Sequence, residues 1–168
     1  RSGAGGTVGT AHVAQSAPDG YTIMMASPSS HLGAPLLFRT PGYEGVDDFS
    51  HIATFSIGTA IVCVHPGLPI RNIQELIAYA KANPSKINFG SAGLGDSTQM
   101  ATELFNETFD IKMTAVPYKG ISPAQLDLVA GRLDMIITTI ASIKGNAADS
   151  LPKLAFTGAT READYPNI

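Results

Sequence analysis

An expected strand, a glycine-rich loop and an expected helix follow one another over residues 86–105, KINFGSAGLGDSTQMATELF. Apolar residues around Phe89 predict a short strand that stops at Gly90, and apolar residues then recur at helical spacing after the loop. Asp96 and Gln99 have the spacing of a helix N-cap and a capping box. A helix N-terminus behind such a loop offers N–H groups and the positive end of a dipole to an anion. The loop therefore predicts either a small-carboxylate site or a structural turn, with equal weight.

The loop lacks the two common nucleotide-binding patterns. No Gly-Lys-Ser/Thr follows it, and Thr98 stands where a dinucleotide fingerprint has its third glycine. The hydroxyl groups of Ser91, Ser97 and Thr98 favour hydrogen bonding to a ligand over charge pairing. The negative charge of Asp96 opposes an anion if that side chain points inward.

Strands and helices alternate from residue 59 to residue 158, which predicts an α/β fold with a largely parallel sheet. In such sheets ligands bind beyond the C-terminal ends of the strands. The expected strands are 21–26, 52–55, 60–64, 87–89, 111–116, 133–137 and 154–156. Helices are expected over 7–16, after an Asn72 cap, after Asp96, from a Ser122 cap to Gly131, and weakly over 140–148. Polar loops follow strands at 27–31, 90–98, 117–122 and 138–139.

Composition excludes several classes of protein. The 168 residues are 44% hydrophobic and 15% charged, as in a globular protein with a proper core, and no apolar run is long enough to span a membrane. The net charge of −3 and the lack of Lys/Arg clusters argue against nucleic-acid partners. The single cysteine, Cys63, excludes an intrachain disulfide, and its apolar neighbours predict a small buried side chain.

Candidates for catalysis are few. No histidine pair has metal-ligand spacing with acidic partners, and no Ser or Cys stands in a nucleophile motif. Loops rich in small hydroxyl residues suit binding and release better than chemistry. We therefore expect no catalytic residue, no metal site and no cofactor, and a protein that is not an enzyme.

Four motifs together resemble one family. The motifs are GAGGTVG (3–9), APDGYTIMMAS (17–27), GSAGLGDSTQMATELF (90–105) and VPYKGISPAQLDLVAGRLDMI (116–136). In order and spacing they resemble the Bug family, the extracytoplasmic solute receptors of tripartite tricarboxylate transporters. The resemblance implies a type II periplasmic-binding-protein fold: two α/β lobes with mostly parallel sheets that close on a ligand between them. It also implies that a small carboxylate is held by loop amides, hydroxyls and bridging waters.

Carried across by position, the resemblance implies ligand contacts from both lobes. The implied ligand-binding residues are Ser27, Ser30, His31, Ser91, Ala92, Gly93, Thr98, Thr138 and Thr139. Thr138 and Thr139 stand where the family often carries an Asp-Asn or similar polar pair, so selection of an amino-bearing ligand there is not expected. Asp96 and Gln99 also depart from the family pattern, which places small neutral residues and His at these positions.

The resemblance also implies an organisation into lobes. Residues 1–58 form part of the first lobe, 59–150 the second lobe, and 151–168 a segment that returns to the first. The first strand and ligand loop of the family, and its C-terminal segment, are not in this sequence, so the first lobe is expected to be incomplete. Unpaired sheet edges would then favour an edge-paired or swapped dimer.

These observations lead to one functional hypothesis and two alternatives. The hypothesis is a periplasmic receptor that captures a small carboxylate and delivers it to membrane permease subunits, closing about hinges near 56–59 and 150–153. The alternatives are the effector-sensing domain of a transcription regulator and an enzyme on the same two-lobed scaffold.

Overall fold

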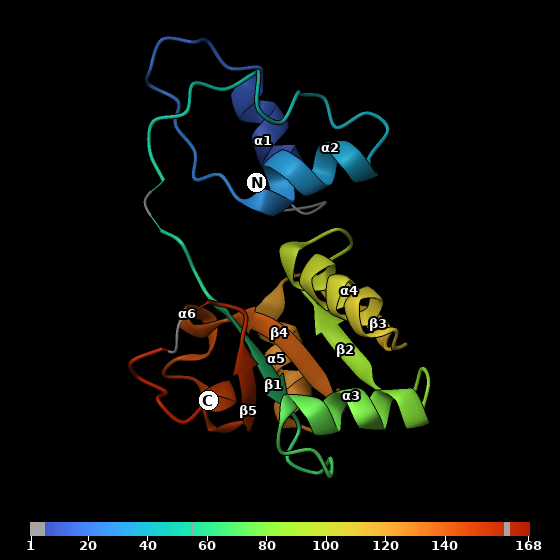
Figure 1. Ribbon diagram of the computed structural model, residues 1–168. Helices are drawn as coiled ribbons and strands as arrows, with labels where there is room; N and C mark the ends of the chain where they lie inside the picture. Colours follow the sequence, from blue (N-terminus) through green and yellow to red (C-terminus); the bar gives the residue numbers. More distant parts are fainter. Residues whose placement is uncertain (1–5, 55, 160–161) are drawn as a thin grey trace.

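Five strands between Ala60 and Phe156 form one sheet in the computed structural model, which describes residues 6–54, 56–159 and 162–168 (Figure 1). The strands are β1 (Ala60–Val64), β2 (Asn88–Ser91), β3 (Thr114–Pro117), β4 (Met135–Thr139) and β5 (Lys153–Phe156). The helices are α1 (Thr7–Ala14), the π-helical η2 (Ser29–Gly33), α2 (Ala34–Leu37), α3 (Ile73–Ala82), α4 (Ser97–Phe109), α5 (Ile121–Val129), α6 (Ile140–Ile143) and the 3-10 helix η3 (Ala147–Ser150). We refer to residues 60–156 as the sheet unit and to residues 6–54 as the N-terminal unit.

The sheet has the strand order β3-β2-β4-β1-β5. β2 runs parallel to β3 and to β4, because crossover helices α4 and α5 connect these strands in turn. β1 runs antiparallel to both β4 and β5. Four strands therefore point one way and β1 alone is reversed, so the sheet is mixed where the alternation of elements predicted a largely parallel one.

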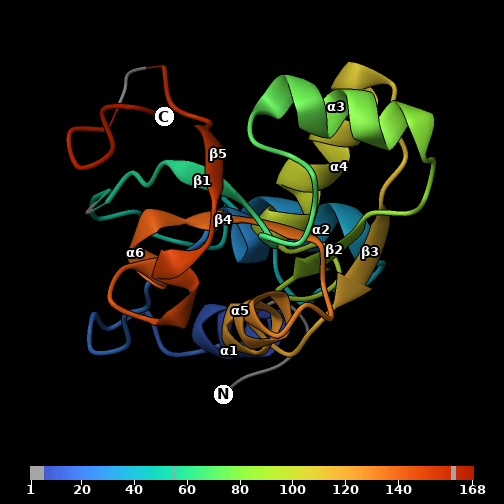
Figure 2. The same cartoon turned by 90° about the horizontal axis from the view of Figure 1, so that it is seen from below.

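Helices cover both faces of the sheet, which explains the unbroken apolar sequence of β1 (Figure 2). Val62 and Val64 pack with Phe89 against α3 on one face. Ile61 and Cys63 pack against α5 and the α6–η3 region on the other. Cys63 is fully buried, as expected, and burial raises the pKa of its thiol to about 11.

The N-terminal unit lies apart from the sheet and connects to β1 through an extended segment (Figure 1). The predicted strand over 21–26 is wrong: this segment is extended but unpaired, and the side chains of Tyr21, Ile23 and Met25 are 92%, 75% and 75% exposed. Residues 52–54 form no strand either, and residue 55 lies outside the described residues. A strand requires a neighbour for its backbone hydrogen bonds, and neither segment lies beside one among the described residues.

The starts of two helices show how far local sequence signals reach. The side chain of Asn72 accepts a hydrogen bond from the Glu75 amide at 2.9 Å, which confirms the predicted cap of α3. The predicted Ser122 cap is wrong, because α5 begins at Ile121 after Gly120, whose φ is 108°. The amide of Gly120 donates to the carbonyl of Ala92 at 3.0 Å, so a contact with the neighbouring loop sets this helix start.

No helix in the described part of the chain is both long enough and apolar enough to cross a membrane.

Candidate functional site

The loop before α4 is already filled by side chains of this chain. Asp96 Oδ1 accepts hydrogen bonds from the amide of Thr98 at 2.8 Å and from its hydroxyl at 2.5 Å. Thr98 Oγ1 in turn accepts from the amide of Ala92 at 3.0 Å, and Gln99 Oε1 accepts from the amide of Gly95 at 2.9 Å. Asp96 is therefore the N-cap that the sequence predicted. Because these amides already donate to side-chain oxygens, an anion at this helix start would have to displace those side chains.

A residue of the N-terminal unit also occupies this helix start. The Ser97 amide donates to Ser29 Oγ at 2.9 Å, and the Ser29 hydroxyl donates to Asp96 Oδ2 at 3.2 Å. The side chain of Ser29 is buried by this contact. Sequence reasoning missed Ser29, since nothing in the run SPSS distinguishes it from the serines at either side.

Ser27, Ser30 and His31 do not reach across to the α4 loop in this structure. The hydroxyls of Ser27 and Ser30 lie 3.3 Å apart, and Ser30 Oγ lies 3.0 Å from His31 Nδ1. Tyr43 donates a hydrogen bond to the carbonyl of Ser30. The three candidates therefore form one bonded group inside the N-terminal unit, at the start of η2.

This group borders a surface pocket of about 310 Å³ that extends along α1 from its N-cap, Gly6, to Val13. Gly6, the N-cap residue, has φ 95°, and no side chain caps α1 among the described residues. No acidic residue stands in the first turn of α1, in contrast to the α4 start with its Asp96. The pocket is lined by Gly6, Gly9, Thr10, His12, Val13, Met24, Met25, Ser27 and Ser30. It combines hydroxyls and a helix start with apolar walls, which suits a small anion with a hydrocarbon part.

The remaining candidates gather at one edge of the sheet. Ser91 ends β2 and Thr138–Thr139 end β4, and these strands are parallel neighbours, so their ends lie side by side. Ser91 and Thr138 are buried, and Thr138 Oγ1 lies 2.8 Å from Ser142 Oγ. Thr139 is exposed. The structure thus brings Ser91, Ala92, Gly93 and Thr98 next to the threonine pair.

The polar loop at 117–122 holds the neighbouring ends of β2 and β3 together. The amide of Tyr118 donates to the carbonyl of Ser91 at 2.9 Å, which extends the pairing of β3 with β2. The Tyr118 hydroxyl donates to Asp127 Oδ2 at 2.7 Å. Burial, and then this carboxylate neighbour, raise the pKa of Tyr118 to about 12. Neutral Tyr118 therefore fixes the turn between β3 and α5 through this hydrogen bond.

The surroundings of His31 disfavour its protonated form. Burial lowers its pKa from 6.5, and the nearby His51 adds to the effect. Its ring centroid lies 4.7 Å from that of Phe49 and 6.4 Å from those of Tyr43 and His51. A protonated imidazole in this aromatic cluster would lose hydration without gaining a carboxylate partner among the described residues.

Acidification is expected to loosen the N-terminal unit. Between the unfolded pKa of about 6.5 and the lower folded pKa, unfolded His31 binds more protons than folded His31, so this contribution to stability falls as pH falls. Hydrogen exchange over residues 27–51 should therefore accelerate when the pH is lowered from about 7.5 to about 5.5, after correction for the intrinsic rate. A His31→Gln variant should lose most of this extra acceleration, whereas the matched His12→Gln variant on α1 should keep it. Equal pH dependence in both variants would contradict the assignment to His31.

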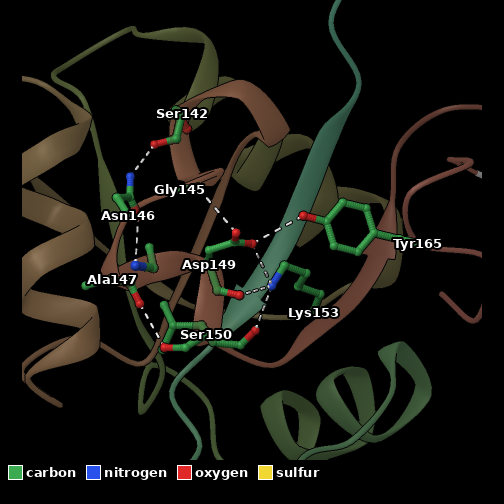
Figure 3. Close-up of polar contacts among 10 residues, drawn as sticks. Ser142, Gly145, Asn146, Ala147, Asp149, Ser150, Lys153 and Tyr165 are labelled. Atoms are coloured by element: carbon green, nitrogen blue, oxygen red, sulfur yellow. Dashed lines mark hydrogen bonds and ion pairs between the residues drawn. The ribbon is translucent and has the colours of Figure 1, made fainter.

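A second polar cluster lies around η3 and β5 (Figure 3). Lys153 Nζ donates to the carbonyl of Leu151 at 3.3 Å and also to that of Asp149, and lies 3.5 Å from Asp149 Oδ1. The Tyr165 hydroxyl donates to Asp149 Oδ1 at 3.2 Å, and its ring centroid lies 5.5 Å from Lys153 Nζ. These mutual contacts tie residues near the C-terminus to the start of β5. In the described ranges, no three His, Cys, Asp or Glu side chains group as metal ligands.

Comparison with known proteins relates the whole chain to one family. The family model described as "Tripartite tricarboxylate transporter family receptor" matches residues 1–168. A UPF0065 protein in the tcbD-tcbE intergenic region of Pseudomonas sp. (strain P51) is 34% identical over 169 residues, which cover 100% of this chain and 50% of that protein. Protein BugT of Bordetella pertussis is 30% identical over 170 residues, covering 100% of this chain and 52% of BugT. The chain thus spans about half the length of the curated relatives it matches.

Solved structures agree with this relationship. R. palustris Rpa4515 with adipate is 34% identical, with a TM-score of 0.88 over 96% of this chain and 54% of that one. MatC from Rhodopseudomonas palustris with bound malate is 25% identical, with a TM-score of 0.86 over 99% of this chain and 57% of that one. The structure of periplasmic binding protein BugD is 29% identical, with a TM-score of 0.83 over 99% of this chain and 56% of BugD. The chain therefore has about half of a type II periplasmic-binding-protein fold.

Proposed function

The chain belongs to the receptor family of tripartite tricarboxylate transporters, and from this premise we propose that it is the part of a periplasmic receptor that captures a small organic carboxylate. The pocket at the start of α1 carries the proposal. It joins the N-terminus of α1, where none of the described side chains caps the helix, to the hydroxyls of Ser27 and Ser30, which can donate to a carboxylate. The carboxylates bound in Rpa4515 and MatC, adipate and malate, support this ligand class.

The apolar part of the pocket suggests how the ligand would lie. Val13, Met24 and Met25 line it together with the polar groups. A carboxylate at the α1 start would place its hydrocarbon chain along these side chains, and flexible methionines accommodate ligands of different lengths. We propose that Thr139 provides a contact from the sheet unit when the two lobes close around the ligand, while the buried Ser91 and Thr138 hold this end of the strands in place.

The lobe boundaries at 1–58, 59–150 and 151–168 remain part of the proposal, as do hinges near 56–59 and 150–153. The extended approach to β1 supports the boundary at 58–59 and the hinge near 56–59. β5 (Lys153–Phe156) pairs with β1 inside the sheet unit, and the Thr157 amide donates to the Ala60 carbonyl at 2.9 Å, so the return crossing would leave the sheet unit after Phe156, beside the entry to β1. Two adjacent crossings are a suitable hinge for lobe closure.

Delivery to membrane permease subunits, a periplasmic location and a role in binding without catalysis are proposed on the same family basis. The exposed Tyr21, Ile23 and Met25 support pairing of the N-terminal unit with another chain, so an edge-paired or swapped dimer also remains a proposal.

A calorimetric titration of this chain with adipate and malate, extended to mono- and tricarboxylates, tests the ligand proposal. We expect at least one free acid to bind, and its methyl ester to bind more than about tenfold more weakly because the ester lacks the charge that the helix start attracts. Ser27→Val should reduce affinity by a similar factor, since it removes a hydroxyl from the pocket. The matched control is Ser150→Val, whose hydroxyl bonds the carbonyl of Ala147 in the sheet unit, outside the pocket. Equal affinity for acid and ester, or no binding of any acid, would reject the proposal.

A further inference from the structure

We infer that Ser29 is a positioning residue that clasps the N-terminal unit to the α4 start of the sheet unit. Its oxygen accepts from the Ser97 amide at 2.9 Å and its hydroxyl donates to Asp96 Oδ2 at 3.2 Å. Ser29 thus supplies an acceptor to a helix N-terminus and a donor to the carboxylate that caps it. A serine can satisfy both groups at once because its hydroxyl both donates and accepts.

Two glycines beside Ser29 let the backbones approach. A Cβ at Gly33 would lie 3.0 Å from the Gly95 carbonyl oxygen and 3.1 Å from Met100 Cε. The backbone of Gly33 has φ −68°, which any residue adopts, so the close approach and not the local conformation favours glycine here. At Gly95 a Cβ would lie 2.1 Å from Leu37 Cδ1. The clasp therefore consists of a hydrogen-bonded serine and a tight contact between η2–α2 and the α4 loop.

The clasp changes the part that the α4 start plays. Asp96 places a negative charge there, and Ser29 takes the Ser97 amide that an anion would use. The α4 start therefore binds the other unit, while the α1 pocket remains for the carboxylate; this division of roles rests on the proposed function. Loss of this contact is therefore predicted to raise the population in which the two units lie apart.

Paired spin labels test the clasp directly. Leu36→Cys on α2 and Leu126→Cys on α5 offer label sites that are 86% and 63% exposed, and Cys63 is buried and does not compete for the label. With no ligand added, pulsed electron resonance should show one dominant short distance. Ser29→Ala should raise the ratio of long to short distances about threefold to tenfold, the effect of losing one hydrogen-bonded contact. Gly33→Leu should shift most of the population to longer distances, because its side chain cannot fit against Gly95 and Met100.

The matched control is Ser97→Ala, because the clasp uses the backbone amide of Ser97 and not its side chain. This variant should keep the short distance. Circular dichroism of each variant checks that the helices remain folded. If Gly33→Leu unfolds the N-terminal unit, Gly33→Ala replaces it in the distance measurement, because alanine favours a helix. Distances in Ser29→Ala and both Gly33 variants that equal those of Ser97→Ala would overturn the clasp. Since no ligand is present, a failure of carboxylate binding leaves this result unaffected, and the two inferences stand or fall separately.

Discussion

Replacing Phe89 with alanine is expected to lower the free energy of unfolding of the sheet unit by about 3–5 kcal/mol. Phe89 is fully buried in β2, between the parallel strands β3 and β4, and packs in the core on the α3 side of the sheet. The substitution removes apolar burial and leaves a cavity that the two paired neighbours prevent from collapsing. Urea unfolding followed by circular dichroism, together with hydrogen exchange of the β2 and β4 amides, measures the loss.

Phe109→Ala is the matched control for this prediction. The Phe109 side chain, at the C-terminal end of α4, is 37% exposed, and its ring contacts Phe105 at a centroid distance of 4.8 Å. Phe109→Ala should lower the free energy of unfolding by much less than Phe89→Ala does, since less apolar surface is buried at Phe109. If both variants lost equal stability, Phe89 would not be the centre of the core.

Gly90→Val should destabilise the sheet unit by about 1–3 kcal/mol or more, through overpacking. A Cβ at Gly90 would lie 2.6 Å from Leu133 Cδ1 and 2.9 Å from the Cβ of Ala124 on α5. Valine adds two methyl groups beyond this Cβ, so α5 must move away from the sheet. The same unfolding measurement as for Phe89 quantifies the effect.

A second substitution tests whether Leu133 causes this clash. Leu133→Ala alone should destabilise the sheet unit. In the Gly90→Val background the same substitution should lower the free energy of unfolding less, or raise it, which a double-mutant cycle reports as a favourable coupling. Gly58→Val is the glycine control, because a Cβ there would meet only Thr139 Cγ2 at 3.7 Å, an ordinary contact. Additive losses at positions 90 and 133 would contradict the packing explanation.

The parts of the fold that depend on local sequence could be predicted. The apolar run of β1 gave its bounds, since a strand covered on both faces contains no polar break. Asn72 and Asp96 were recognised as helix caps because a cap depends on residues two or three positions away. The strand over 21–26 was misread because an apolar run does not reveal whether a neighbouring strand is present.

The parts that depend on distant contacts could not be predicted. Gly90 was expected to end its strand, but β2 continues to Ser91, and the glycine is required by packing against α5. Gln99 has capping-box spacing, yet its side chain bonds the Gly95 amide, because the Asp96 amide donates to the Gly93 carbonyl. Ser29 meets Ser97 across 68 positions of sequence, and no spacing rule reaches so far.

The reversed strand β1 has a consequence for synthesis of the protein on the ribosome. β1 emerges before every other strand of the sheet, yet both of its neighbours, β4 and β5, are translated last. Until then its AIVCV sequence has no partner, and an uncharged apolar segment of high β-propensity is prone to associate with other nascent chains. Ala60–Val64 is therefore the strand of this sheet that waits longest for its partners during synthesis.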